Sequence, residues 1–593
     1  MKNKVRMHNS YTSSRVRRRR DLSHSSSNSI LIWQSTVWRS RIIILLLLMG
    51  FLAVFIRAFY LQHLDVDTWK KRAITRYTET QPIPAARGKI LDRNGEILAV
   101  STLEFKVGIV PNRFSPNSKQ INDFAKLIGK SPEDIIKKHQ NSKKYFYISS
   151  GVNPNIKNQI KNLGVSGIEF EQIYQRNYPY KDAFSTLLGL TSETDKGQDG
   201  VEFAFDDQLR GVQGLRFIHV ERGNIAFDEK ILKEPAPGND VHLSIDASMQ
   251  SMVYKNALIA KHKHNAKSVS VVVVDSRSGD ILAMVNAPAF DPGKRKNLSL
   301  DDIRNRSVTD SFEPGSTFKP FAIAAALDKG LVEPLTIIDT SPGYIKLNGE
   351  ILRDFKPFGI LSVSDVLAKS SNVGTVRVAL KLNPSHMYDY YQTLGFGKSP
   401  NLPLGGLAKG RLSPWQSWDK VTRATISYGH GVSVSLAQLA QAYTVFARSG
   451  DLIPISLLKS NFKRRGIQVF SNESIMSVRF MLERASSSFG TGVKAQVDGF
   501  RIAGKTGTAQ KAENGGYSKN RYIASFVGIA PLDNPRFVIA VMVDEPKGVR
   551  TGGQVAAPIF SKIASDALTR LQMSPNQPKQ VLPKTAFLKS SSR

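Results

Sequence analysis

The 593-residue chain contains no cysteine, and its ten histidines are scattered without metal-ligand spacing. The lack of cysteine excludes disulfides, thiolate zinc sites and cysteine nucleophiles, and it leaves the redox compartment open. The histidine pattern gives no reason to expect a metal, so ordinary surface or core roles are expected for these residues. Neither a phosphate-binding glycine loop nor an internal repeat is present. We therefore expect no cofactor.

Acidic residues are few beside basic ones, with 49 Asp and Glu against 82 Lys and Arg and a formal net charge of +33. Residues 1–41 hold ten of the basic residues and one acid, Asp21. Such a tail can bind nucleic acid, but here it precedes an apolar run, which favours retention on the cytoplasmic side of a membrane. The remaining charge suits a protein beside anionic lipid or wall polymer, although a solvated basic surface explains it equally well. We expect no nucleic-acid partner.

Only one apolar run is long enough to cross a bilayer, and it extends from Ile42 to Leu61. Its single charge, Arg57, lies near one end, where it can reach the headgroups. A cleaved signal peptide has a shorter apolar core and a small-residue cleavage site, which this segment lacks. We therefore predict a disordered cytoplasmic tail (1–41), a signal anchor (42–61) and all later residues outside the membrane.

The rest of the chain is too long for one hydrophobic core, so two or more domains are expected. Its 41% hydrophobic and 22% charged residues are ordinary for globular protein. The clearest interior break is Glu234–Asn239, which is rich in proline and glycine. We predict domains over 62–238 and 239–572, followed by a flexible tail over 573–593.

Hydrophobic patterns predict secondary structure mainly in the second of these domains. Strands are expected at Val241–Ile245, at Ser268–Val274 and Ile281–Val285 as a hairpin, and at Arg501–Ala509, Ser525–Ala530 and Phe537–Val543 as one antiparallel sheet; a helix is expected at Ala247–His262.

Three short motifs carry the chemistry: Ser316-Thr317-Phe318-Lys319, Ser370-Ser371-Asn372 and Lys505-Thr506-Gly507-Thr508. Together they are the parts of a serine acyl-transfer site that uses no histidine. Each motif alone is weak to moderate evidence. All three in this order are much less probable by chance.

In the first motif, a helix is expected to begin at Ser316 after Pro314 and Gly315. Residues three apart share a helix face, so Lys319 Nζ can reach the Ser316 hydroxyl. To act as a base, Lys319 must be neutral near pH 7, which requires burial and a second cation, Lys505, to lower its pKa. The alternative is a helix-capping serine with a surface lysine.

In the second motif, the preceding residues Val363–Lys369 look helical, which places the triplet at a helix-to-loop junction. Ser370 is then a candidate to relay a proton to the leaving amine, and the Asn372 amide to hold a substrate peptide group. The alternative is an ordinary turn rich in Ser and Asn.

In the third motif, Gly507 lies inside a strand, a position that commonly marks the close approach of another backbone. An extended peptide can pair along such a strand edge, and Lys505, Thr506 and Thr508 can hold its terminal carboxylate. The backbone N–H groups of Ser316 and Thr508 are candidates for an oxyanion hole. The alternative is a simple bend in a strand.

From these residues outward, the chain resembles the class B penicillin-binding proteins over nearly all positions from the anchor to about residue 570. Within that family it is most similar to the division-specific FtsI group. Further signatures are Arg87–Glu96, Arg176–Pro179, Gly200–Glu202, Asn305-Arg306, Phe312–Gly315 and Gly552–Pro558, the last resembling a strand-edge motif. Thr551 stands where the family often has an aromatic residue, and Gly405-Gly406 where it often has Gly-Glu.

The resemblance implies a multi-domain α+β protein. A single transmembrane helix would precede a non-catalytic α/β pedestal (62–238) and a β-lactamase-like transpeptidase domain, in which helices flank an antiparallel sheet. Ser316 would attack the D-alanyl-D-alanine carbonyl of a peptidoglycan stem peptide with Lys319 as base, and β-lactams would acylate the same serine. An amine from a neighbouring stem peptide would then take the acyl group.

The resemblance further implies a single-pass protein of the bacterial inner membrane, with a periplasmic catalytic domain at the division septum. Its partners would be an FtsW-type glycan polymerase and other divisome proteins. Three alternatives remain open: an elongation-type class B transpeptidase, a hydrolase such as a D,D-carboxypeptidase or β-lactamase, and a catalytically silent β-lactam-binding scaffold. No deacylating carboxylate can be assigned for a hydrolase, and the intact Ser316, Lys319 and Lys505 argue against a silent scaffold.

Overall fold

A computed structural model describes residues 37–64, 78–219, 229–295, 298–460, 464–513 and 516–575. Most of the predicted tail 1–41 and of the predicted tail 573–593 lies outside these residues. Contacts place the described residues of 80–217 and 230–575 in one compact unit. That unit carries all three motifs.

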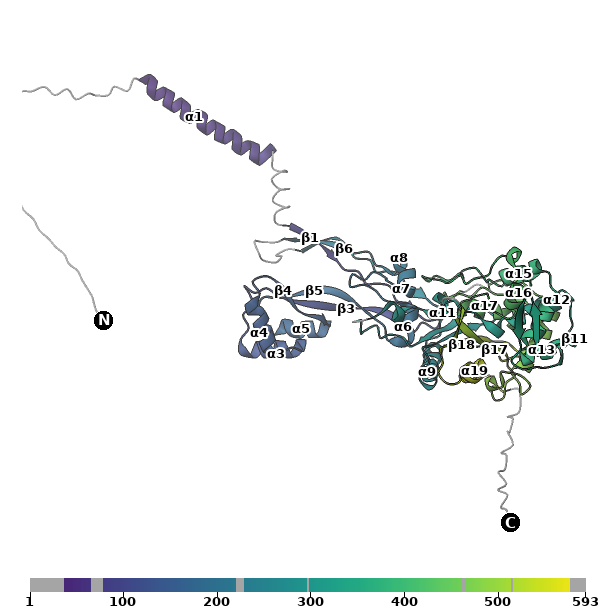
Figure 1. Cartoon of the computed structure of the whole chain (residues 1–593). Coiled ribbons are helices and arrows are strands. Elements are labelled where there is room, and N and C mark those ends of the chain that lie inside the picture. Colours follow the sequence, from purple (N-terminus) through teal and green to yellow (C-terminus); the bar gives the residue numbers. More distant parts are fainter. Residues whose placement is uncertain are drawn as a thin grey trace, which may run out of the picture. The chain divides into compact units, whose positions relative to one another are not determined.

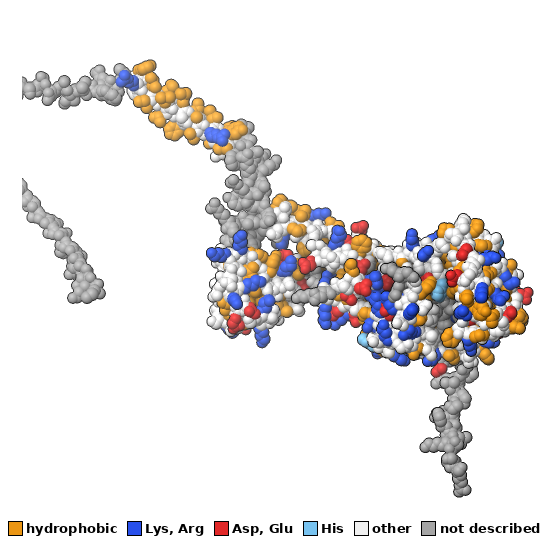
Figure 2. Space-filling model, in the orientation of Figure 1, with side chains coloured by type: hydrophobic (Ala, Val, Ile, Leu, Met, Phe, Trp, Pro, Cys, Tyr) orange, Lys and Arg blue, Asp and Glu red, His pale blue; other side chains and the backbone are white. Residues whose placement is uncertain are grey.

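The predicted membrane anchor is a helix, α1 (Val37–Phe59), continued by a π-helical turn, η1 (Tyr60–Leu64). Residues 37–41, predicted to be disordered, are therefore helical. The segment Trp38–His63 is long and apolar enough to cross a membrane, and its side chains are exposed. Figure 2 shows apolar side chains along the helix, with Lys or Arg only near its two ends. This charge distribution suits a helix whose ends reach the two membrane surfaces.

The N-terminal part of the compact unit contains a sheet in the order β4-β3-β2-β8. A further strand, β5, pairs with β3 along the edge opposite β4. All pairs are antiparallel except β2–β8. The strand predicted over 241–245 is shorter, because only Val241–His242 pairs, as β8, with β2. The elements of this part are β2 (Ile90–Leu91), β3 (Ile97–Ile109), α3 (Ser118–Ile128), α4 (Pro132–Asn141), β4 (Phe146–Val152), α5 (Pro154–Asn162), β5 (Ile168–Asn177), α6 (Asp182–Leu188), α7 (Gly200–Ala204) and α8 (Asp206–Leu209). A separate sheet consists of β1 (Thr78–Ile83), β6 (Gly214–His219) and β7 (Glu229–Lys233).

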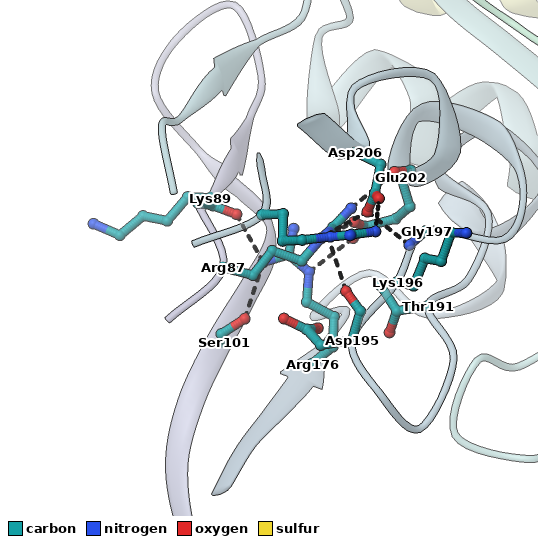
Figure 3. Close-up of polar contacts among 12 residues, drawn as sticks. Arg87, Lys89, Ser101, Arg176, Thr191, Asp195, Lys196, Gly197, Glu202 and Asp206 are labelled. Carbon is teal, nitrogen blue, oxygen red and sulfur yellow. Dashed lines mark hydrogen bonds and ion pairs between the residues drawn. The ribbon is translucent and has the colours of Figure 1, made fainter. Parts of the chain in front are cut away.

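A buried ionic network joins three of the sequence signatures in this part of the molecule (Figure 3). Glu202 lies between two arginines, receiving a 2.7 Å hydrogen bond from Arg87 Nε and another from Arg176 Nε. Arg87 also donates to Asp206 at 2.7 Å and to the Asp195 carbonyl at 3.0 Å. Because Glu202 and both arginines are at most 5% exposed, the carboxylate and the two cations compensate one another away from water.

The C-terminal part is built on a five-stranded antiparallel sheet in the order β10-β9-β19-β18-β17. Its strands are β9 (Ser268–Asp275), β10 (Ile281–Ala287), β17 (Ala503–Glu513), β18 (Gly516–Ala530) and β19 (Phe537–Asp544), which confirms the predicted hairpin and the predicted antiparallel strands. Every residue of β9 is buried. This explains why Val271–Val274 is a continuous β-branched run and why the alternation of Ser and Val before it does not continue along the strand.

Helices cover both faces of this sheet. Val269, Val271 and Val273 of β9 pack in one core with α9 (Ala247–Lys263) and α19 (Gly552–Arg570), whereas Val272 and Val274 pack in the other, larger core. Figure 1 shows α9 and α19 on one side of β17 and β18 and α17 on the other. Helix α9 confirms the predicted helix at 247–262. The segment 552–558, expected at a strand edge, instead forms the first turns of α19.

The remaining elements lie mostly on the side of the larger core. They are α10 (Leu300–Ile303), α11 (Arg306–Thr309), η2 (Gly315–Thr317), α12 (Lys319–Asp328), β11 (Ile337–Asp339), β12 (Tyr344–Leu347), β13 (Glu350–Arg353), β14 (Ile360–Ser362), α13 (Val363–Lys369), α14 (Asn372–Ala379), α15 (Pro384–Thr393), η3 (Trp415–Ser417), α16 (Lys420–Ser427), α17 (Leu436–Ala447), β15 (Asp451–Leu452), β16 (Ile467–Gln468), α18 (Asn472–Ala485) and η4 (Val493–Ala495).

Candidate active site

The first motif forms a tight turn that enters a helix. The helix predicted to begin at Ser316 begins at Lys319, because residues 315–317 form the 3-10 turn η2. Gly315 has φ +54, a left-handed conformation that glycine adopts without a Cβ penalty. The turn is held at both ends: Gly315 N donates to Gly429 O at 3.1 Å, and Tyr443 OH donates to Thr317 O at 2.7 Å. These hydrogen bonds fix the backbone around Ser316, whose side chain is half-buried.

An aromatic core anchors the same turn. Phe318 is fully buried between Tyr391 and Phe396, with both ring centroids 4.7 Å from its own. Large buried rings in edge or tilted contact stabilise a core beyond their area alone. The buried ring of Phe318 therefore fixes the backbone between Ser316 and Lys319.

Lys319 and Lys505 meet at the second motif. Lys319 Nζ donates to the Ser370 carbonyl and lies 3.2 Å from Ser370 Oγ, and Lys505 Nζ donates to the same Oγ at 2.9 Å. The hydrogen bonds that Lys319 makes among the described residues go to Ser370, and the expected one to Ser316 is not among them. Ser316 lies in the 3-10 turn that precedes the α-helix carrying Lys319.

Burial controls the charge of both lysines. Both side chains are fully buried. Desolvation holds the pKa of Lys319 well below its usual value, the neighbouring Lys505 lowers it further, and Asp354 opposes the shift. Burial lowers the pKa of Lys505 to about 7. The direction and both causes at Lys319 agree with the sequence expectation, and the pair can supply a neutral amine and a cation around one hydroxyl.

The second motif lies between two helices, which confirms the helix predicted at 363–369. Ser370 has φ +62 as the left-handed cap of α13, and Ser371 begins α14 by accepting a 2.8 Å hydrogen bond from Gly374 N. Asn372 donates its amide to Arg353 O at 2.8 Å and is half-buried. The cap geometry thus turns Ser370 toward the two lysines.

Asp354 is a site residue that no sequence motif indicated. Its carboxylate accepts hydrogen bonds from Ser371 Oγ at 2.7 Å, from Val373 N at 3.0 Å and from Asn372 N. A carboxylate at a helix N-terminus is stabilised by the free N–H groups there. Asp354 therefore fixes the start of α14 and also supplies the negative charge that acts on Lys319.

The third motif lies on β17, at the edge of the five-stranded sheet. A Cβ on Gly507 would lie 2.9 Å from Pro314 O and 2.9 Å from Thr317 Cγ2, so the turn that carries Ser316 is in close contact with this strand. The predicted close approach at Gly507 thus comes from the chain's own backbone. Thr508 accepts a 3.0 Å hydrogen bond from Gly552 N, where α19 begins.

Thr506 is the other threonine of the third motif. Its hydroxyl pairs with Thr491 Oγ1 at 2.6 Å, and Lys505 Nζ lies 3.4 Å from the same hydroxyl. Thr506 and Thr508 thus flank Gly507 along β17. The structure brings all eight predicted site residues to one region, where the start of α12, the α13–α14 junction and β17 meet.

The arrangement agrees with three comparisons. A family model described as "Penicillin binding protein transpeptidase domain" matches residues 269–565, and one described as "Penicillin-binding Protein dimerisation domain" matches residues 82–243. The "Probable peptidoglycan D,D-transpeptidase PenA" of Neisseria meningitidis is 36% identical over 536 residues, covering 89% of this chain and 92% of the relative. The "Peptidoglycan D,D-transpeptidase FtsI" of Escherichia coli K12 is 32% identical over 547 residues, covering 91% and 93%.

A solved structure is similar over the catalytic part. The transpeptidase domain of Burkholderia pseudomallei penicillin-binding protein 3 is 43% identical, with a TM-score of 0.53, and covers 57% of this chain and 98% of that one. The similarity accounts for the fold of the catalytic part. The chain belongs to the class B penicillin-binding proteins, a family of serine-type peptidoglycan D,D-transpeptidases with a dimerisation domain before the catalytic one.

Proposed function

We propose that Ser316 is the nucleophile and that Lys319 is its base. The observation that carries this assignment is the buried contact of Lys319 and Lys505 with Ser370, beside the turn that presents Ser316. Since burial and a second cation disfavour charge on Lys319, its neutral amine is available near pH 7 to take the Ser316 proton. Ser316 Oγ then attacks the D-alanyl-D-alanine carbonyl of a stem peptide, and an ester forms.

Ser370 and Lys505 serve the leaving group. The Ser370 hydroxyl contacts both lysines, so it can pass the proton from Lys319 to the departing D-alanine amine. Lys505 donates to Ser370 Oγ as a cation and stabilises that oxygen during the transfer.

The substrate is proposed to lie along the free edge of β17. An extended peptide pairs with an edge strand through main-chain hydrogen bonds. Thr506 and Thr508 then face its terminal carboxylate, and the Asn372 amide holds a peptide group. The N–H groups of Ser316 and Thr508 form the oxyanion hole, which the contact of the Gly315 turn with the Thr508 backbone supports.

In the cell, the chain is proposed to cross-link septal peptidoglycan during division. The similarity to the E. coli FtsI over 91% of this chain supports that role, as do the long basic tail and the arginine in the anchor. An FtsW-type glycan polymerase and other divisome proteins would be its partners, with a pedestal over 62–238 and a catalytic domain over 239–572. The alternative is the same reaction in an elongation complex.

The experiment is an intact-mass measurement on the full-length protein in detergent after brief exposure to benzylpenicillin. The parent and a control, Ser399→Ala, which alters an exposed serine, should each gain one penicilloyl group, and Ser316→Ala should gain none. An equal adduct on Ser316→Ala would refute the nucleophile assignment, and rapid turnover of penicillin by the parent would indicate a hydrolase.

The cellular role requires a separate measurement. Depletion should produce filamentous cells, and a fluorescent fusion should gather at mid-cell. Rounded cells with a fusion along the side walls would instead establish the elongation role.

A further inference from the structure

A carboxylate and an imidazole lie beside the nucleophile turn and have no part in the reaction as described so far. Glu313 precedes Ser316 by three residues, and its Oε2 lies 3.6 Å from His430 Nδ1. That oxygen is buried and makes no hydrogen bond within the described part of the chain. The pair therefore has the composition of the base and its orienting acid in a catalytic triad.

Backbone contacts hold the two groups against the turn of Ser316. Gly431 N donates to Glu313 Oε1 at 2.9 Å, and Gly315 N donates to Gly429 O at 3.1 Å. A Cβ on Gly429 would lie 2.3 Å from Gly315 O, so the two turns touch. His430 directly follows Gly429, and the backbone of Gly429 contacts Gly315, the residue before Ser316.

Aromatic rings line the imidazole. The ring of Tyr428 lies 5.2 Å and that of Tyr517 5.7 Å from the His430 ring, and Tyr517 OH donates to Glu313 Oε1 at 3.1 Å. The His430 side chain keeps 29% of its surface exposed and the Glu313 side chain 16%. A ligand can therefore reach the imidazole, but bulk water does not surround it.

Four titratable groups act on His430 or lie against it. Burial lowers the pKa of His430, the carboxylate of Glu313 raises it, and Lys319 lowers it. The phenols of Tyr428 and Tyr517 are the other two groups, and burial raises the pKa of each to about 12, so both stay neutral. Since the net shift at His430 is downward, the imidazole is neutral near pH 7 and can accept a proton.

We propose that His430 is the general base for the acceptor amine in the second half of the reaction, with Glu313 as its positioning residue. The proposal rests on the acyl-enzyme at Ser316 described above. Glu313 would accept the hydrogen on Nδ1, which leaves the lone pair of Nε2 for the amine. Lys319 takes the proton of Ser316 in the first half-reaction and returns a proton to Ser316 Oγ in the second, so His430 is an additional base that acts only in the second half-reaction.

The proton balance of this step is complete. The acceptor arrives as an ammonium ion and gives one proton to His430 Nε2. Its nitrogen then attacks the acyl carbon, the bond from that carbon to Ser316 Oγ breaks, and an amide forms. The second proton of the nitrogen passes through Lys319 to Ser316 Oγ, and His430 later releases its proton to water.

The test separates the half-reactions in His430→Gln, using the full-length protein in detergent. His386→Gln, which alters an exposed histidine of α15, is the matched control. The first half is read as the rate of acylation by benzylpenicillin. The second is read as discharge to glycine, the probe amine, of an acyl-enzyme formed from a D-alanyl thioester donor. We expect unchanged acylation and about 100-fold slower discharge at pH 7, the usual contribution of a general base.

The pH profile distinguishes a base from a structural residue. The deficit should shrink as pH rises toward the pKa of the glycine amine, because a free amine needs no base. Discharge in His430→Gln equal to the parent, or a deficit that is the same at every pH, would overturn the proposal. If the parent itself formed no adduct at Ser316, the proposed function would fail instead.

A second variant decides the matter if His430→Gln is not acylated and is therefore misfolded. Glu313→Gln keeps an acceptor oxygen for Gly431 and Tyr517 but removes the charge that raises the pKa of His430. The acid limb of the discharge rate should move to lower pH, while the rate of acylation by benzylpenicillin stays that of the parent. An unmoved limb would refute the role of His430.

Discussion

At the scale of single residues, the site depends on two lysines that share one hydroxyl oxygen. Two ammonium groups this close and fully buried repel each other strongly, so at least one of them gives up its proton. Desolvation and the neighbouring cation of Lys505 both lower the pKa of Lys319. Asp354 is the carboxylate that limits this shift.

Replacing Asp354 by Asn should move the pH dependence of acylation. Asp354 raises the pKa of Lys319, so its removal lowers that pKa further and makes the neutral amine available at lower pH. The acid limb of the rate of acylation by benzylpenicillin should therefore move to lower pH, as stopped-flow measurements would show. Asp389→Asn, at an exposed position on α15, is the control, and a shift to higher pH would contradict the assigned cause.

Glu202 should be needed for stability and not for chemistry. Substitution by Gln keeps the shape of the side chain but leaves Arg87 and Arg176 buried without their shared carboxylate. Breaking a buried ion pair in this way costs about 3–5 kcal/mol of unfolding free energy. Urea unfolding measures the loss, with the exposed Glu350→Gln as control. A change below about 1 kcal/mol would mean that the network is not compensating charge.

At the scale of secondary-structure elements, glycines allow three segments to meet. Gly507 of β17 faces the turn that carries Ser316, and Gly552 at the start of α19 is packed so that its Cβ would lie 2.3 Å from Gly507 O. Gly429 makes the corresponding contact with Gly315. Side chains at these positions would separate the strand, the turn and the helix that together place Ser316.

Gly507→Ala should therefore slow acylation without unfolding the protein. The new methyl group would meet Ser525 Oγ at 2.4 Å as well as Pro314 O, and the turn of Ser316 would have to move. A displacement of about 1 Å in a catalytic group costs about 100-fold in rate. Acylation by benzylpenicillin is the measurement. Gly405→Ala is the control, because a Cβ there meets nothing within 4 Å, and equal rates in both variants would contradict the packing argument.

At the scale of the whole molecule, an apolar helix and a compact folded unit have separate tasks. The apolar side chains of α1 are exposed, which is unfavourable in water. The compact unit, in contrast, buries its apolar side chains in its own hydrophobic cores. The helix is suited to attach the protein to a membrane, and the unit contains the whole candidate site.

Removal of residues 1–64 should release the protein from membranes without loss of its reaction with penicillin. The reason is that the described residues of the site and its supporting cores all lie after Thr80. Fractionation of cells followed by labelling with a fluorescent penicillin tests both parts. A truncated protein that remained in the membrane fraction would indicate a second attachment surface.

The sequence by itself determined the chemistry and most of the catalytic fold, because these depend on local patterns. The spacing of Ser316 and Lys319, the glycine in the Lys505–Thr508 strand and the β-branched run of β9 are all readable along the chain. The anchor was predictable for the same reason, since a bilayer sets a minimum apolar length.

Only the tertiary structure decided which partners these residues have. It showed that Lys319 bonds to Ser370, that Ser316 lies in a 3-10 turn, and that 552–558 is helical. It also brought Asp354, Glu313 and His430 to the site. The spacing of residues along the chain does not reveal the chemistry of these three. Periodicity shows which face of a helix or strand is buried, but not which residues far apart in sequence meet there.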